Sequence, residues 1–426
     1  MTPHAVRRLA AFTTAAALAA VAAPLPAHAQ LGPHLAATPD GGAQFSYTAS
    51  APWGQQAAER RLGSSGALVP AQGVSHLSES VADDAVGVDG TGTALLAWRV
   101  ATGPNAVRAR RRAPDGSLGA VHTVTPDGAG AFAFRLAVEP DGDAVFAWTR
   151  LVSGHRVVQV RRLSAGGALG AVKTMSSTAV DADSFDLGVA PDGTALAVWR
   201  IKVPDSTDSY LQIRRMAPNG TLGAVTAITA KTGAAVDEPH VGVSDAGAAV
   251  FTWAAATPTA ALVTRGRSPG GTLGPAQTVS PLFPGTGIGV ATDPSGRTAY
   301  AFVSMSGLSF PLQGRIRQAS GSLGPAFTLA SGGGLAPAVA LDPDGNATFA
   351  WIQQESNLTV QARRRTVSGA LGTTRPISDP SGNATAVRVV VDGANKATLA
   401  WFDGMSTLTR TLATGGSLTP IRQVAP

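Results

Sequence analysis

Aromatic residues recur along the chain at intervals of 49 to 54 residues, each within a short apolar segment. The recurring positions are Tyr47, Trp98, Trp148, Trp199, Trp253, Phe302, Trp351 and Trp401. Six residues before each aromatic stands a glycine or, in the last copy, asparagine: Gly41, Gly92, Gly142, Gly193, Gly247, Gly296, Gly345 and Asn395. These two residue types accept a positive φ most readily, so the pattern predicts a tight turn in every copy.

The segments on either side of this turn predict the first two strands of each repeat. In the third copy the turn is Pro140-Asp141-Gly142, with Leu136–Val138 before it and Ala144–Trp148 after it. Proline fixes the first turn dihedral, aspartate can accept hydrogen bonds from the backbone ahead, and glycine takes the left-handed corner. The combination predicts a tight β-hairpin.

Two further strands complete each repeat. An alternating segment such as Val158–Arg161 predicts a third strand. It ends at a second glycine, which is Gly66, Gly116, Gly167, Gly220, Gly271, Gly321, Gly369 or Gly416. Two residues later a leucine opens a predicted fourth strand, of the type Ala171–Met175: Leu68, Leu118, Leu169, Leu222, Leu273, Leu323, Leu371 and Leu418.

The second strand is apolar on both faces, which is typical of a sheet covered on both sides. Eight four-stranded antiparallel repeats arranged radially provide that cover, and no segment has helical periodicity. We therefore predict an all-β, eight-bladed β-propeller that closes without sharing a strand between its ends. Residues 30–426 form this single domain, with blades at roughly 31–80, 81–130, 131–180, 181–235, 236–284, 285–333, 334–380 and 381–426.

The repeats resemble those of secreted bacterial β-propeller proteins whose blades carry an Asp-Pro-Asp-Gly hairpin before a tryptophan strand, as in Asp342–Gly345 followed by Trp351. The resemblance covers the whole chain after the leader and implies architecture and export, not activity. The aromatic comes six residues after the glycine rather than about three, so the chain does not match Asp-box sialidases. The Gly-His and Trp-Asp pairs of WD40 blades are also missing.

An arginine also recurs, six residues before the second glycine of each repeat. Its copies are Arg60, Arg110, Arg161, Arg214, Arg265, Arg315, Arg363 and Arg410. We interpret it as structural: a long guanidinium can lie over a neighbouring aromatic while binding turn carbonyls or aspartates. An eightfold anion-binding ring is the alternative. The recurring aromatics are likewise interpreted as core residues rather than a platform for sugars.

Small residues in the first strand indicate that this strand is innermost, where the blades converge. They are Ala36, Gly87, Ala137, Gly188, Gly242, Ala291, Ala340 and Val390. Two residues earlier, on the same face, stand His34, Ala85, Arg135, Asp186, His240, Gly289, Ala338 and Arg388. We expect this variable position near one mouth of the channel, with His34, Arg135 and Arg388 as candidate site residues.

The loops that vary between repeats are expected on the face opposite the tight turns, and an acidic cluster stands out among them. Its members, all candidate ligand-binding residues, are Asp181, Asp183, Asp186, Asp205, Asp208, Tyr210, Asp237, Glu238 and His240. Carboxylates at alternate spacing could bind Ca²⁺ or a cationic partner. Solvated loop acids are the favoured interpretation, because the glycine and bidentate glutamate of an EF-hand are missing after Asp181. We therefore expect no cofactor, with Ca²⁺ as a weak alternative.

The first 29 residues have the layout of a secretory signal: Arg7-Arg8, an alanine-rich apolar run and Ala27-His28-Ala29. We expect cleavage before Gln30, Sec export and a secreted protein without a membrane span. Twin-arginine export through Arg7-Arg8 is the alternative, but Leu9-Ala10-Ala11 matches that signal poorly. The chain has no cysteine, which excludes disulfides and thiolate metal sites. The chain after the leader carries a net charge of +4. Its arginines are spread over the repeats, so nucleic acid is not an expected partner.

No catalytic motif is present: the chain has no Gly-x-Ser-x-Gly elbow, His-Glu-x-x-His pair or phosphate-binding glycine loop. The favoured hypothesis is a monomeric, non-enzymatic module that binds an extracellular protein, peptide or glycan through the variable-loop face. The second is a carbohydrate-active hydrolase or lyase with carboxylates at the channel mouth. The third is a rigid scaffold without a small-molecule ligand.

Overall fold

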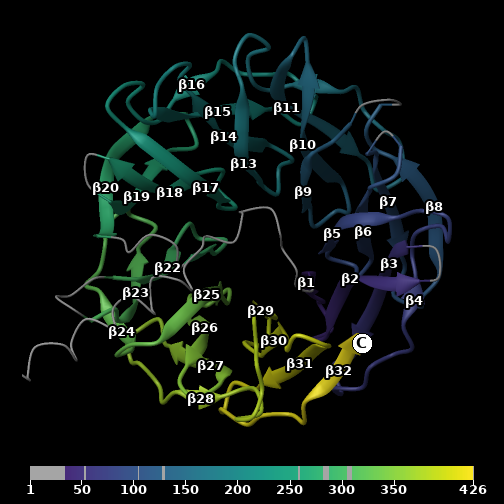
Figure 1. The fold of residues 1–426 in the computed structure, drawn as a ribbon, viewed down its shortest axis with the longest axis vertical. Helices are drawn as coiled ribbons and strands as arrows, with labels where there is room; N and C mark the ends of the chain where they lie inside the picture. Colours follow the sequence, from purple (N-terminus) through teal and green to yellow (C-terminus); the bar gives the residue numbers. More distant parts are fainter. Residues whose placement is uncertain are drawn as a thin grey trace, which may run out of the picture.

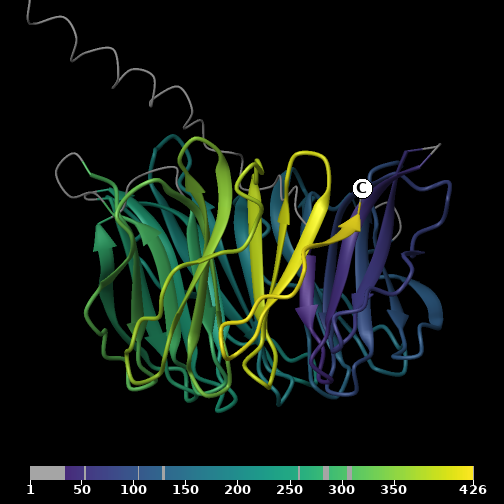
Figure 2. The same cartoon turned by 90° about the horizontal axis from the view of Figure 1, so that it is seen from below.

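A computed structural model describes residues 34–51, 54–103, 105–126, 130–257, 260–281, 287–304 and 309–425. The predicted leader lies outside these residues. Eight four-stranded antiparallel sheets stand around a central axis (Figure 1), and each sheet uses four consecutive strands of the chain. The chain is therefore an all-β, eight-bladed β-propeller, as the repeats predicted. Figure 2 shows the strands running between the two faces of the ring.

The first strand of each blade lies closest to the axis, and the second follows it (Figure 1). The innermost strands are β1 (His34–Ala37), β5 (Val81–Val88), β9 (Ala133–Val138), β13 (Ala182–Val189), β17 (Ala235–Val243), β21 (Ile288–Thr292), β25 (Gly334–Leu341) and β29 (Ala386–Val391). The second strands are β2 (Ala43–Ala51), β6 (Ala94–Val100), β10 (Ala144–Val152), β14 (Ala195–Lys202), β18 (Ala249–Thr257), β22 (Thr298–Val303), β26 (Ala347–Gln354) and β30 (Ala397–Phe402).

The third and fourth strands form the outer part of each blade. The third strands are β3 (Gly54–Leu62), β7 (Val107–Arg112), β11 (His155–Leu163), β15 (Ser209–Met216), β19 (Ala261–Arg267), β23 (Leu312–Arg317), β27 (Leu358–Arg365) and β31 (Thr407–Leu412). The fourth are β4 (Gln72–Gly73), β8 (Leu118–Thr123), β12 (Lys173–Thr174), β16 (Thr226–Ala227), β20 (Leu273–Pro281), β24 (Phe327–Ala330), β28 (Arg375–Pro376) and β32 (Arg422–Ala425).

The fourth strand differs from its prediction in six blades. Only β8 and β20 begin at the predicted leucine. Elsewhere that leucine forms an isolated bridge to the end of the third strand, as Leu169 does with Leu163, and the regular strand starts later. Just after the bridge, the carbonyl of Gly170 accepts a hydrogen bond from the Arg161 side chain at 2.7 Å. The outer edge of these blades is therefore a bridge followed by a short strand.

The predicted turn and core positions are confirmed. All sixteen recurring turn positions have a positive φ, including Asn395 at 62°. The recurring aromatics are buried, and the second strands are almost wholly buried, as in β22, whose six residues are all inaccessible to solvent. The two copies without tryptophan keep the register: Ser46, before Tyr47, pairs with His34, and Ala301, before Phe302, pairs with Gly289.

The recurring arginine joins each blade to the one before it. Its Nε donates to a carbonyl of its own fourth segment, as Arg161 does to Gly170, and its Nη1 donates to a carbonyl of the preceding blade, as Arg161 does to Val124 at 2.9 Å. The equivalent inter-blade bonds of the other seven are Arg60 to Gln423 and Val424, Arg110 to Val74, Arg214 to Thr174 and Met175, Arg265 to Ile228, Arg315 to Thr278 and Val279, Arg363 to Thr328 and Leu329, and Arg410 to Ile377.

These bonds confirm the structural interpretation of the arginine, but only in part. Carbonyls are its partners, as expected. The expected stacking on aromatic rings is wrong for this arginine, because the described cation–π contacts involve other residues: Arg135, Arg156, Lys231 and Arg365.

The ring closes by contact between its first and last blades. Neighbouring innermost strands contact one another all the way round, including β29 with β1. Arg60 of the first blade binds two carbonyls of β32, and Lys396 of the last blade binds the Gly41 carbonyl. Since no blade mixes strands from the two ends of the chain, the predicted closure without a shared strand is confirmed.

Candidate functional site in the central channel

Eight equivalent residues of the innermost strands form a set that we call the channel ring: His34, Ala85, Arg135, Asp186, His240, Gly289, Ala338 and Arg388. Each pairs with the residue that precedes the recurring aromatic of its blade. Asp186 is the fifth of eight residues in β13, and Arg135 is the third of six in β9. Asp186 and Arg135 therefore lie within their strands, whereas His34 begins β1.

Three consecutive members of the channel ring are close to one another. Arg135 Nε lies 3.7 Å from Asp186 Oδ1, and His240 Nδ1 lies 3.8 Å from Asp186 Oδ2. The same Oδ2 accepts a hydrogen bond from the backbone N–H of Val241 at 3.0 Å. Asp186 thus links three blades, and its carboxylate is already bound by backbone of the next blade.

The two histidines of the ring are held neutral. Burial lowers the pKa of His34 to about 3, with further lowering by the positive charges of Arg388 and Arg135. Burial also lowers the pKa of His240, where Arg135 assists and the charge of Asp186 opposes the shift. At neutral pH the charged members of the ring are therefore Arg135, Asp186 and Arg388, with a net charge of +1.

Arg388 is the ring cation without an acidic partner among the described residues. Its guanidinium has a weak hydrogen bond to the Val387 carbonyl at 3.5 Å and belongs to none of the described ion pairs. Burial and then repulsion by Arg135 lower its pKa. Arg135 donates to the Phe134 carbonyl at 3.0 Å and shares Asp186 with His240. Positive charge in the channel is therefore only partly neutralised.

Asp183 and Asp237 of the predicted acidic cluster are joined by Arg200, which the sequence reasoning missed. Arg200 Nε lies 2.7 Å from Asp183, its Nη1 lies 2.5 Å from Asp237, and Lys202 Nζ lies 3.1 Å from Asp183. Burial would raise the pKa of Asp183, but the hydrogen bonds and charges of Arg200 and Lys202 outweigh it and hold this pKa below its usual range. The signal was available, because Arg200 directly follows Trp199 at the end of an apolar strand.

The remaining candidates are spread over separate contacts. Asp181 accepts from the backbone N–H of Arg156 at 2.7 Å, and Asp208 accepts from that of Gly233 at 2.9 Å. Tyr210 lies under the Lys231 ammonium at 5.9 Å from its ring centroid. Burial, followed by the charge of Asp237, raises the pKa of Glu238. Asp205 occupies a turn with a φ of 56°.

Among the described residues, no three histidine, cysteine, aspartate or glutamate side chains come together in a way that could hold a metal ion. The expectation of no cofactor, and its weak alternative of Ca²⁺ binding, both stay untested. Helices long and apolar enough to span a membrane are likewise not found in the described ranges.

Comparison with known proteins does not assign the chain to a family. No family model matches the sequence, and no curated protein does. Among solved structures, the polysaccharide lyase Uly1 aligns over 94% of this chain and 91% of its own, at 12% identity and a TM-score of 0.47.

The propeller domain of the Trilobed protease from Pyrococcus furiosus aligns over 70% of this chain and 84% of its own, at 8% identity and a TM-score of 0.43. The α-L-arabinofuranosidase Arb93A from Fusarium graminearum aligns over 70% and 94%, at 14% identity and 0.40. Likeness at this level does not bear on function.

Proposed function

We propose that the protein is a non-enzymatic binding module whose channel ring receives an anionic group of an extracellular protein, peptide or glycan. The observation that supports this proposal is Arg388, a guanidinium in the channel with no carboxylate partner among the described residues. Arg135 adds a second positive charge, and guanidinium groups bind carboxylates and other oxyanions in paired hydrogen bonds.

The acidic residues favour binding over glycoside cleavage. Cleavage by two carboxylates needs one free group on each side of the scissile bond. Asp183 and Asp237 share Arg200, and Asp186 is bound by Val241 and faces Arg135 and His240. These carboxylates are therefore occupied in joining blades. The secretory leader that the sequence predicts at 1–29 is the basis for placing the module outside the cytoplasm.

The proposal is tested by titrating the mature protein with oligoglutamate and oligogalacturonate at low salt. We expect the affinity for both probes to fall as the salt concentration rises. We also expect Arg388→Gln to lower the affinity about tenfold or more, because the variant loses a charge-assisted contact. Arg422→Gln, an exposed arginine on β32, is the matched control and should bind as the parent does.

Equal affinities for the parent and Arg388→Gln would contradict the proposed site. Release of shortened or unsaturated sugars from oligogalacturonate would instead favour the hydrolase or lyase hypothesis.

A further inference from the structure

One position differs between blades in a way that changes the contact with the next blade. The residue after the recurring arginine is a second arginine in five blades, namely Arg61, Arg111, Arg162, Arg215 and Arg364. Arg111, for example, reaches the following blade and donates to the carbonyls of Gly142 and Ser164 at 2.7 and 3.0 Å. In the fifth blade this position is Gly266, so no side chain of this position enters the space before the sixth blade.

A cavity of about 670 Å³ lies at this place, between the fifth and sixth blades on the tight-turn face. Its walls are partly apolar, with Val250, Pro269 and Pro275, and partly polar. The polar groups of the wall that matter here are Ser268, Thr272, Gln277, Ser320 and Ser322. Cavities of several hundred Å³ with a few placed polar groups are typical of small-molecule sites.

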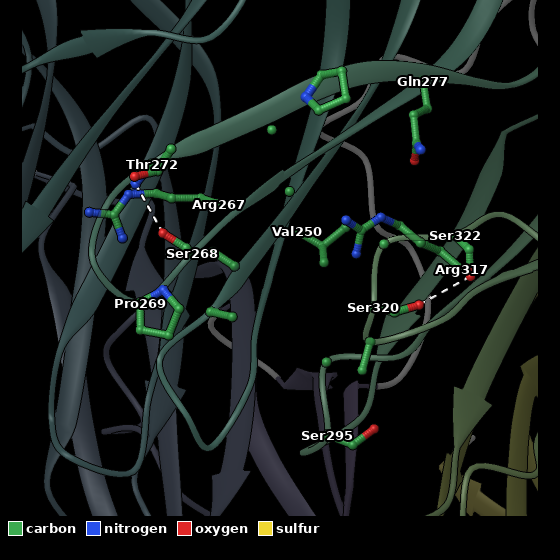
Figure 3. A pocket seen from close by; sticks show the side chains of 18 residues that line it. Val250, Arg267, Ser268, Pro269, Thr272, Gln277, Ser295, Arg317, Ser320 and Ser322 are labelled. Atoms are coloured by element: carbon green, nitrogen blue, oxygen red, sulfur yellow. Dashed lines mark hydrogen bonds between the residues drawn. The ribbon is translucent and has the colours of Figure 1, made fainter.

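The Arg317 guanidinium points into the middle of this cavity, beside Val250, whereas Arg267 points away from it (Figure 3). Arg317 is only 9% exposed, and no hydrogen bond or ion pair of its side chain occurs among the described contacts. Its Nη2 would lie 2.4 Å from a Cβ placed at position 266, so glycine is what makes room for it. The Arg317 Nε is buried without a hydrogen-bond partner, which is costly, and an anion beside the guanidinium would supply the missing acceptor.

At one other blade boundary an anion occupies the equivalent place. Arg112 of the second blade occupies the position of Arg317, since Arg112 pairs with Ala94 and Arg317 with Thr298, each four residues before the recurring aromatic. Arg112 Nε forms a buried ion pair with Glu59 of the first blade at 2.8 Å.

In the fifth blade the counterpart of Glu59 is Thr264. Its hydroxyl donates to the Phe251 carbonyl at 3.0 Å and accepts from the Tyr300 hydroxyl at 2.8 Å, so it does not serve Arg317. The space between blades five and six thus lacks both the second arginine that five blades carry and the carboxylate that pairs with Arg112 between blades one and two.

We infer that this cavity is a binding site for a small organic acid. Its carboxylate takes the place beside Arg317 that the Glu59 side chain takes beside Arg112, and the body of the ligand lies toward the hydroxyls of Ser268, Ser320 and Ser322. A planar carboxylate matches the guanidinium in a way that a neutral sugar or polyol does not.

Thermal unfolding of the mature protein with gluconate, and with sorbitol as its uncharged counterpart, tests this site. Gluconate should raise the melting temperature progressively, since a ligand that binds only the folded state stabilises it by mass action. Sorbitol, and sodium chloride at equal ionic strength, should give no matching rise. Acetate, which has the carboxylate alone, should act in the same direction at higher concentration.

Two test variants and one control variant show whether Arg317 is responsible for the gluconate response. Arg317→Met should fold, because the aliphatic chain keeps the packing without the unpaired charge, and should lose the response to gluconate. Arg365→Gln is the matched control: Arg365 has the equivalent place in the next blade but lies over the Phe327 ring at 4.6 Å, so the response should be kept. Thr264→Glu, which restores the Glu59 arrangement, should raise the melting temperature and abolish the response.

No response to gluconate or acetate in the parent, or the same response in Arg317→Met, would overturn the inference. An equal response to phosphate would assign the site to oxyanions in general and overturn the assignment to carboxylates. Arg388→Gln should keep the gluconate response, so the result is independent of the channel-ring proposal.

Discussion

Several buried ionisable side chains in this protein lie where one blade meets the next. Asp84 in β5 is 7% exposed and accepts a hydrogen bond from Ser46 in β2 of the preceding blade. Burial raises the pKa of Asp84 to about 7; the Ser46 hydrogen bond opposes the shift and the Asp83 charge adds to it. The pair joins two blades through a carboxyl that holds its proton near neutral pH.

Asp84 gives the stability a defined pH dependence. An unfolded aspartate titrates near pH 4, so between about pH 4 and 7 folding takes up a proton at Asp84. Its contribution to the free energy of unfolding therefore falls as pH rises through this range, by up to about 4 kcal/mol, and is constant above it. Asp84→Asn keeps an acceptor for Ser46 and cannot ionise, so it should be more stable than the parent at pH 8 and lose this advantage toward pH 4.

Chemical denaturation of both proteins across this pH range measures the difference. Asp115→Asn is the control: Asp115 is exposed, and its hydrogen bonds from Ser117 hold its pKa below the usual value, so its variant should track the parent from pH 5 to 8. If the free energies of unfolding of the parent and of Asp84→Asn change in parallel from pH 4 to 8, the pKa of Asp84 is not raised and its carboxylate is ionised in the folded protein.

At the scale of single residues, sequence reasoning succeeded where the repeat itself carried the information. The recurring arginine was predicted as structural, because a residue needed in every blade serves packing. Arg200 was missed, since its role depends on Asp183 and Asp237 approaching from two different blades. Gly266 could have been found from the sequence, because three copies lack the second arginine of the repeat, at Gly266, Ile316 and Thr411, and only Gly266 leaves the position without a side chain.

The innermost strands show how closely the elements must approach. A Cβ built on Gly87 in β5 would lie 2.4 Å from Val138 of β9, and one on Gly242 in β17 would lie 2.0 Å from Thr292 of β21. Small side chains at this position therefore set the distance between neighbouring blades, as the sequence indicated. Its prediction of the fourth strand was less accurate, because the leucine fixes only the turn and the outer edge has no further neighbour to impose a regular strand.

Gly87→Ala should destabilise the protein by about 1–3 kcal/mol, because the added methyl group must displace Val138 in a packed interface. Gly73→Ala in β4 is the matched control: it also lies in a strand, but a Cβ there would meet no atom within 4 Å, so it should leave stability unchanged or slightly raised. Urea unfolding of the two variants measures both values. Similar stabilities for the two would mean that the innermost strands can move apart at little cost.

At the scale of the whole molecule, every blade consists of four consecutive strands, and every boundary between blades has the bond of the recurring arginine. The boundary between the last and first blades carries the same arginine bonds as the others, here from Arg60 to Gln423 and Val424. The sequence predicted this closure from its first and last strands. It could not predict the channel ring's charge balance, which depends on five blades placed around one axis.

This equivalence predicts that new chain ends are tolerated at another boundary. A circular permutant that joins residue 426 to residue 30 through a short flexible linker, and opens between β16 and β17, should fold with a melting temperature within a few degrees of the parent. Differential scanning calorimetry, with circular dichroism for strand content, checks it. A permutant that is aggregated, or much less stable, would show that the first and last blades meet in a way that the other boundaries do not share.

The direction of the recurring arginine bonds also sets an order in time. Each arginine reaches back to the blade that precedes it in the chain, so in a chain that folds from its N-terminus as it emerges from the export channel, blades two to eight find their acceptors already present. Arg60 is the exception, because its acceptors in β32 belong to the eighth blade, which emerges after the other seven. The first blade to be made is thus the last to be completed, and chains truncated after the seventh blade should stay open and sensitive to protease at their first blade.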